Sequence, residues 1–207
     1  DTIKGYTPEP ALGINVNDFI DGSTNTLGYY TASVYMNDAM IITVRLDDIG
    51  YDETRYLHAF SDYKTKKLKG IWMRCMFEQL GNGWSHMYEY TSSYRRFSER
   101  GRLEANIGQV KRVRIDITDA SGNKSTVSFL MQFNKPVELP PVACDKKNVF
   151  NVNKANSFSN TNVAFVLDEK ALYENMCFEF GRKRDADSYS DRFGISKSYI
   201  PVHTYFE

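Results

Sequence analysis

The sequence lacks the features that mark several large classes of protein. Its longest apolar runs fall far below the roughly 18 residues that a membrane-spanning helix needs. Lys plus Arg and Asp plus Glu number 26 each, so the formal net charge is +0. A chain with balanced charge offers no long-range attraction to nucleic acid or to an acidic substrate. We therefore expect neither a membrane span nor a nucleic-acid partner.

Histidine is scarce, which limits the metal sites that the chain can build. Only His58, His86 and His203 are present, and no H-x-H or H-E-x-x-H motif occurs. His58 and Asp62 have the H-x-x-x-D spacing of two zinc ligands, but a catalytic zinc needs a third protein ligand and an open position. We interpret His58 as a partly buried side chain on a helix, and we predict no metal site and no cofactor.

Motifs for nucleophilic catalysis are missing as well. The chain has no G-x-S-x-G motif and no glycine-rich phosphate loop. Its three cysteines, Cys75, Cys144 and Cys177, lie outside any recognisable catalytic motif. Three buried thiols are the simplest interpretation, and a Cys144–Cys177 bridge is the alternative in an oxidising compartment. We predict that these 207 residues carry no catalytic residue and are not themselves an enzyme.

A clear β pattern lies between residues 110 and 133. Apolar and polar residues alternate in the runs 110–118 and 124–133, and period-two alternation places one face of a strand on a core. Between the runs, Gly122 can adopt the positive φ angle that a tight turn favours. We predict an antiparallel hairpin here.

Two further hairpins follow from the same pattern. One covers residues 29–46 and turns at Asn37-Asp38. The other covers residues 71–90 and turns at Gly81-Asn82-Gly83. Residues 1–11 contain two prolines, so we predict an extended lead-in segment without regular structure there.

The spacing of apolar residues changes between 52 and 63. Tyr56, Ala59, Phe60 and Tyr63 recur at helical intervals, which predicts one short helix. The lysine-rich residues 64–69 that follow are interpreted as a solvated basic loop.

About seven short strands separated by turns are typical of an all-β fold, and we predict an immunoglobulin-like antiparallel β-sandwich over residues 1–135. Residues 136–141 form a stiff, proline-rich linker. Residues 142–207 are predicted to be a second, smaller β-rich segment, which either packs against the first or is cut short. The chain begins without Met, so we also expect it to be a piece of a longer protein.

Aromatic residues are the one surplus in the sequence. Trp84, Tyr88 and Tyr90 lie close together on the predicted 71–90 hairpin. If they share its exposed face, they can stack on sugar rings or hold a partner surface. Burial in the core is the alternative interpretation. These three residues are the candidate ligand or partner surface.

Several short pieces carry a family resemblance. The stretch from Gly13 to Phe133, together with pieces before and after it, resembles the β-rich region that follows the catalytic domain in Gram-negative, lysostaphin-type (LytM-like) zinc endopeptidases. The matching pieces are DTIKG at 1–5, DFIDGS at 18–23, Asn25, Gly28, YDETRY at 51–56, Asp62-Tyr63, DASGN at 119–123, ALY at 171–173 and YIPVH at 199–203.

The resemblance implies a non-catalytic accessory module of a peptidoglycan metallopeptidase. The family's zinc ligands, an H-x-x-x-D and an H-x-H, belong to the preceding domain, so no ligand role passes to His58 or Asp62. The implied partners are the peptidase domain of the same polypeptide and a cell-wall glycan or peptide. The implied location is periplasmic, in the cell envelope or extracellular. The alternative function is a glycan-binding or adhesive surface module that uses Trp84, Tyr88 and Tyr90.

Overall fold

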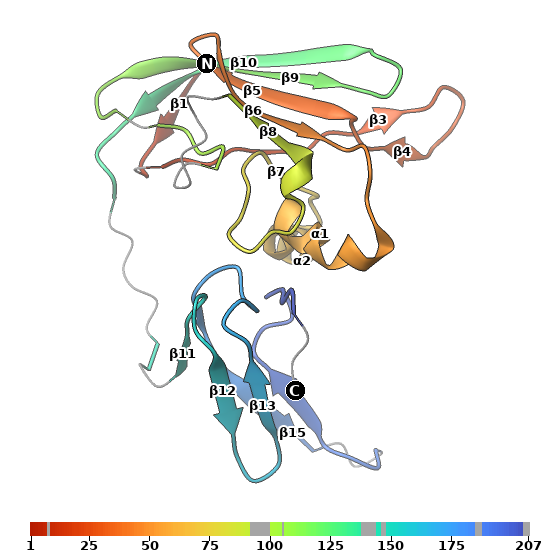
Figure 1. The fold of residues 1–207 in the computed structure, drawn as a ribbon, viewed down its shortest axis with the longest axis vertical. Coiled ribbons are helices and arrows are strands. Elements are labelled where there is room, and N and C mark those ends of the chain that lie inside the picture. The colour runs from red at the N-terminus through yellow and green to blue at the C-terminus, as the bar shows by residue number, and fades with distance from the viewer. Residues whose placement is uncertain are drawn as a thin grey trace.

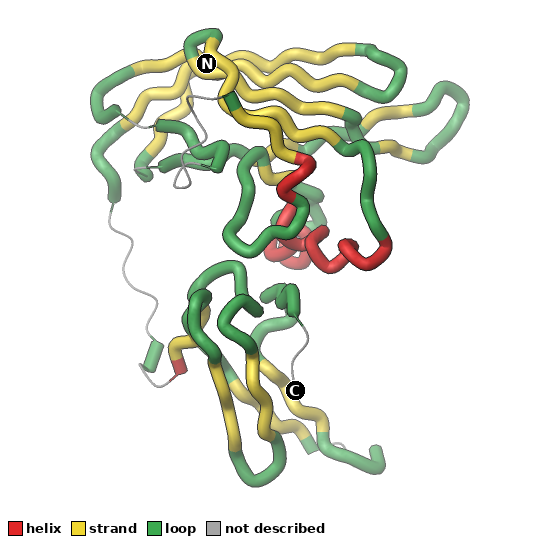
Figure 2. Tube along the Cα trace, in the orientation of Figure 1, coloured by secondary structure: helices red, strands yellow, loops and turns green. Residues whose placement is uncertain are grey.

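The computed structural model describes residues 1–7, 9–91, 100–104, 106–137, 144–145, 148–184 and 188–204. Strands greatly outnumber helices over this part of the chain, so the predicted all-β class is confirmed (Figures 1 and 2). The described residues form two segments, each with its own hydrophobic cluster. The first segment lies within residues 1–137 and the second within residues 148–204. No helix in these ranges is long and apolar enough to cross a membrane.

A six-stranded sheet dominates the first segment, with the strand order β1-β10-β9-β5-β6-β8. All of its neighbouring strands run antiparallel except β1 and β10, which run parallel. The strands are β1 (Thr2–Gly5), β10 (Lys124–Phe133), β9 (Val110–Thr118), β5 (Thr31–Met36), β6 (Ala39–Arg45) and β8 (Tyr88–Tyr90).

The predicted hairpin at 110–133 is confirmed as β9 and β10. The two strands pair from Thr118 and Lys124 at the turn to Val110 and Gln132 at the far end. Gly122 has a φ angle of 90°, as the turn requires. Three apolar residues of β9, Val113, Ile115 and Ile117, face the core, whereas Val110 at its start is exposed. Local alternation was therefore sufficient to predict this part of the sheet.

The predicted hairpin at 29–46 is also confirmed, as β5 and β6. Asn37 and Asp38 at its turn have φ angles of 49° and 66°, which a two-residue type I′ turn requires. The side-chain oxygen of Asn37 accepts a hydrogen bond of 2.9 Å from the backbone N–H of Arg112. This bond attaches the turn to β9, the strand on the other side of β5.

The predicted hairpin at 71–90 is wrong. Strand β7 (Arg74–Cys75) pairs with β2 (Gly13–Ile14), whereas β8 pairs with β6. A 3₁₀ turn, η2 (Ser85–Met87), separates the two halves of the supposed hairpin. Alternation marks which residues are buried but does not identify the partner strand, and here both partners are distant in sequence.

The lead-in segment and the basic loop also differ from their predictions. Residues 2–5 form strand β1 at the edge of the large sheet. Lysine-rich residues 64–69 are helical, because Asp62 caps helix α2 by accepting a 2.9 Å bond from the Thr65 N–H, and Gly70 ends it with a φ angle of 74°. The single helix predicted over 52–63 is divided into η1 (Tyr51–Tyr56) and α1 (Leu57–Phe60), and α2 (Tyr63–Lys69) takes the place of the predicted loop.

The larger core lies between one face of the sheet and the layer of helices and loops beneath it (Figure 1). Its fully buried side chains come from both layers and include Val34, Ile41, Ile42, Val44, Met76, Trp84, Met87, Leu103, Val113 and Phe133. A separate hairpin, β3 (Asp18–Phe19) with β4 (Thr26–Leu27), projects beyond this core and leaves Phe19 68% exposed.

The second segment is built from three small antiparallel pairs. Strand β11 (Val149–Phe150) pairs with β14 (Met176–Cys177), β12 (Asn156–Ser159) pairs with β13 (Ala164–Leu167), and β15 (Phe180–Lys183) pairs with β16 (Arg192–Ile195). A cluster of apolar side chains joins the three pairs.

One disulfide attaches the chain before the second segment to the segment itself. Cys144 and Cys177 are bonded, with their Cα atoms 5.7 Å apart. The interpretation as three thiols is therefore wrong and the Cys144–Cys177 alternative is correct, while Cys75 is a buried free thiol.

Of the predicted linker at 136–141, residues 138–141 lie outside the described residues. Val137 donates a 3.1 Å hydrogen bond to the Tyr6 carbonyl.

Candidate functional site

The candidate aromatic surface does not form. Trp84 is 1% exposed and Tyr88 is 6% exposed, and Tyr90 is half-buried. The Trp84 ring packs 6.2 Å from that of Phe60 and 6.5 Å from that of Tyr56, measured between ring centroids. Trp84 directly precedes the 3₁₀ turn η2, and its indole belongs to the core cluster of the first segment.

The hydroxyl groups of Tyr88 and Tyr90 form hydrogen bonds that stabilise the fold. Tyr88 accepts a 3.1 Å hydrogen bond from the side-chain amide of Asn82. Tyr90 donates a 3.0 Å bond to the Glu78 carboxylate, which also lies 3.5 Å from the Arg100 guanidinium. Burial and the Glu78 charge raise the pKa of Tyr90 well above its ordinary value. Both phenols remain neutral and hold neighbouring loops.

His58 and Asp62 do not form the start of a metal site. The His58 ring lies 4.3 Å from the Tyr63 ring, and both carboxylate oxygens of Asp62 accept hydrogen bonds from Thr65. Burial lowers the pKa of His58. Across the described ranges, no group of three or more His, Cys, Asp and Glu side chains is placed to share a metal ion.

The remaining thiol is unsuited to nucleophilic chemistry. Cys75 is buried on β7, and burial, with the Asp62 charge adding to it, raises the pKa of the thiol to about 12. A thiol with so high a pKa holds almost no thiolate at neutral pH, and the thiolate is the reactive form.

The two segments meet at an aromatic contact, which we call the His203 contact and which consists of Tyr56, Gly81, Tyr173 and His203. A second contact places the Lys64 ammonium 5.6 Å from the centroid of the Tyr199 ring. The His203 ring centroid lies 4.4 Å from that of Tyr173 and 6.3 Å from that of Tyr56. A Cβ atom on Gly81 would lie only 2.8 Å from Cε1 of His203. A side chain at position 81 would therefore displace the imidazole from this contact.

The His203 contact favours a neutral imidazole. His203 is 6% exposed, and its Nδ1 has no hydrogen-bond partner among the described residues. Burial and the Arg55 charge lower the pKa of His203. The Arg55 guanidinium itself lies 5.2 Å from the centroid of the Tyr56 ring. Protonating His203 would bring a second cation to a contact that already has one.

Three of the short pieces that carry the family resemblance converge at this contact. YDETRY at 51–56 forms η1 and supplies Tyr56. ALY at 171–173 and YIPVH at 199–203 meet through a bridge between Leu172 and Val202. The sequence singled out the pieces one by one, but only the fold reveals that they lie together.

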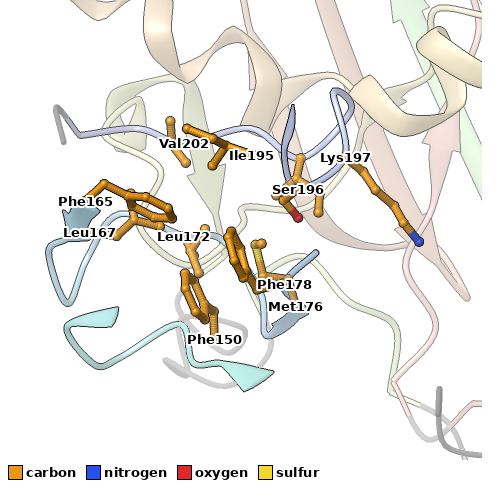
Figure 3. Close-up of a pocket in the computed structure, with 11 residues that line it drawn as sticks. Phe150, Phe165, Leu167, Leu172, Met176, Phe178, Ile195, Ser196, Lys197 and Val202 are labelled. Atoms are coloured by element: carbon orange, nitrogen blue, oxygen red, sulfur yellow. The ribbon is translucent and has the colours of Figure 1, made fainter. Parts of the chain in front are cut away.

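The second segment also contains an apolar cavity of about 180 Å³, which we call the Phe178 cavity (Figure 3). Side chains from several strands and from the chain after β16 line it, including Phe165, Leu172, Met176, Phe178, Ile195 and Ser196. Protein interiors contain few voids larger than a water molecule. Nothing in the alternation of these residues predicts a cavity.

Comparison with known proteins gives one match. Residues 147–207 match the family model of the Zu5-like domain, which covers 61 of the 207 residues. The matched range contains the whole hydrophobic cluster of the second segment. No curated protein matches the chain, and no solved structure does.

Proposed function

We propose that the chain is a non-catalytic accessory module of a secreted or envelope peptidoglycan metallopeptidase, and that it positions or regulates the catalytic domain of that polypeptide. The proposal starts from the resemblance of the short pieces to the region that follows such a domain. The observation that carries it is their convergence: residues 51–56, 171–173 and 199–203 build the His203 contact, which joins the two segments.

The position of β1 supports a positioning role. Residues 1–5 resemble the junction after the peptidase domain, and residues 2–5 are a strand of the large sheet. The N–H of Leu130 donates a 3.0 Å bond to the Asp1 carbonyl, and that of Asn134 donates a 2.9 Å bond to the Gly5 carbonyl. A domain attached ahead of a strand held in this way has little freedom to rotate.

The finer fold proposal is that the first segment is an immunoglobulin-like sandwich. Its six-stranded sheet covers one side of the core, and the short pair β2–β7, which contributes Ile14 to that core, would belong to a second sheet. The partners proposed with this fold are the peptidase domain and a cell-wall glycan or peptide, in the periplasm, the envelope or outside the cell.

The alternative as a glycan-binding module loses its predicted site. Stacking on a sugar ring needs an exposed aromatic face. Trp84 and Tyr88 are buried, and turning them out of the core would destabilise it strongly. A glycan site would have to use other residues.

The experiment uses purified peptidoglycan and the natural polypeptide that contains these residues. We expect residues 1–207 alone to release no peptide fragments, with or without added Zn²⁺, and the natural polypeptide to release them. We expect Ile3→Pro, which removes a backbone donor from β1, to alter that release, with Ile49→Pro in an exposed loop as the matched control. Hydrolysis by residues 1–207 alone would overturn the proposal, as would a natural polypeptide without an H-x-x-x-D and H-x-H pair ahead of Asp1.

A further inference from the structure

The Phe178 cavity points to a binding site that does not depend on the proposed function. We propose that it binds a neutral, mostly hydrocarbon small molecule of the size of one aromatic ring, whose single polar atom hydrogen-bonds the Ser196 hydroxyl. Four observations carry this proposal: the volume of the cavity, its stacked aromatic wall, the unpartnered Ser196 hydroxyl and the absence of a charged group pointing inward.

The volume sets the size of the ligand. The cavity measures about 180 Å³. An apolar cavity of about 150 Å³ elsewhere stays dry and binds benzene, so a ring with one small substituent fits here. The cavity opens to solvent beside Ile195 and Lys197, which gives a ligand a way in, and its walls are almost entirely hydrocarbon.

The aromatic wall is already in place without a ligand. The Phe150 and Phe178 rings stack with centroids 4.6 Å apart and planes 5° apart. Phe178 also lies 5.5 Å from Phe165 and 4.8 Å from Phe158. Because these rings support one another, none of them can move into the cavity without breaking another ring contact.

Ser196 supplies the one polar feature that faces the ligand. Its Oγ is buried and has no hydrogen-bond partner among the described residues. Its backbone has a φ angle of 58°, and its N–H donates a 2.7 Å bond to the Glu179 carbonyl, which keeps the residue in this position. A buried hydroxyl without a partner is unfavourable, and a ligand oxygen or nitrogen would satisfy it.

The charge around the cavity excludes an ionic ligand. Lys197 is the only charged residue in the lining that the structure describes. Its ammonium forms a 3.0 Å ion pair with Glu179 and points away from the apolar side chains (Figure 3). A charged group buried in the cavity would have no counter-charge, so the ligand is neutral.

The test is a ¹⁹F NMR titration of the chain with 4-fluorophenol and fluorobenzene, which differ by one hydroxyl. We expect saturable binding of both compounds, with nuclear Overhauser effects from their ring protons to the Met176 methyl group. Ser196→Ala should shift the ratio of the two dissociation constants about fivefold toward fluorobenzene, the change that one net hydrogen bond produces. The difference in hydration between the two compounds cancels when the ratio in the variant is divided by the ratio in the wild-type chain.

Matched variants locate the site. Ile195→Trp places a large ring at the cavity and should abolish binding of both compounds. Val166→Trp is the control, because Val166 is 47% exposed, close to the 46% of Ile195, and lies outside the lining. No saturable binding by the wild-type chain, or no contact with the Met176 methyl group, would overturn the proposal even if a variant fails to fold. An unchanged ratio in Ser196→Ala would overturn the role of Ser196.

Discussion

The two segments of this chain reach a folded state by different means. The first buries a wide face of a six-stranded sheet under helices and loops, and its central side chains are fully buried. The second has only two-stranded pairs, which are marginal on their own in water. Its stability depends on five clustered phenylalanines, Phe150, Phe158, Phe165, Phe178 and Phe180, and on one disulfide.

This comparison indicates that the second segment depends more than the first on stabilisation from outside its own hydrophobic cluster. Small segments bury too little surface to be stable without covalent staples or an external partner. Here the staple is Cys144–Cys177 and the partner is the first segment, through the His203 contact. Both tryptophans, Trp72 and Trp84, lie in the first segment, so their fluorescence reports on that segment alone.

The largest expected loss of stability comes from a substitution in the core of the first segment. Trp84→Ala removes a fully buried indole, and we expect a loss of about 3–5 kcal/mol in the free energy of unfolding. Urea denaturation followed by far-UV circular dichroism measures it. Trp72→Phe, at a half-buried position, is the control and should cost much less. Equal losses for the two variants would contradict the central place of Trp84.

A nearly equal effect is expected from the disulfide, but confined to the second segment. The bridge joins residues 33 apart, and the chain-entropy treatment assigns about 3–4 kcal/mol to a loop of that length. Cys144→Ser with Cys177→Ser should therefore broaden the amide NMR signals of residues 148–204 while tryptophan fluorescence still reports a folded first segment. Loss of the first segment in the same variant would show that the two unfold together.

A smaller effect separates backbone strain from the contact between the segments. Gly81 and Gly122 both have positive φ angles, 78° and 90°, so alanine at either position costs about 1 kcal/mol. Only at Gly81 would the added Cβ meet His203, since nothing lies within 4 Å of Gly122. We expect Gly81→Ala to lose more stability than Gly122→Ala and to shift the NMR signals of Tyr173 and His203. Equal losses would argue against the contact.

The smallest expected effect is on pH dependence. The folded pKa of His203 lies below its ordinary value of 6.5, so the unfolded chain takes up the proton first as the pH falls. Stability should be level above about pH 7 and decline as acidification passes through pH 6.5. His203→Gln should reduce this decline in thermal melts, and His58→Gln should reduce a separate decline in the first segment. A steeper decline in His203→Gln would contradict the assignment.

The sequence predicted the turns and hairpins whose conformation depends on residues close together along the chain. The turns at Asn37-Asp38 and Gly122 were predictable because a positive φ angle is a local demand that few residues meet. The pairing of β7 with β2, and of β8 with β6, was not predictable, because alternation carries no information about a distant partner. The sequence left Trp84 open between an exposed face and burial, and packing against residues distant in sequence, such as Phe60, decides for burial.

The candidate site was the least predictable part of the molecule. His203 has no motif around it that indicates a contact, and its role depends on a glycine more than a hundred residues earlier in the chain. The Phe178 cavity is a property of how rings from separate strands stack, and the unpartnered hydroxyl of Ser196 is visible only in three dimensions. Sequence patterns describe filled cores and carry no signal for a void.

The parallel pairing of β1 with β10 has a mechanical consequence. Tension between Asp1 and the chain after Phe133 pulls the two strands past each other lengthwise, because they point the same way and are loaded from opposite ends. Their hydrogen bonds, from Asp1–Leu130 to Gly5–Asn134, then bear the load together instead of opening one at a time. The edge of the sheet therefore acts as a shear clamp, which resists stretching of the polypeptide far better than it resists peeling.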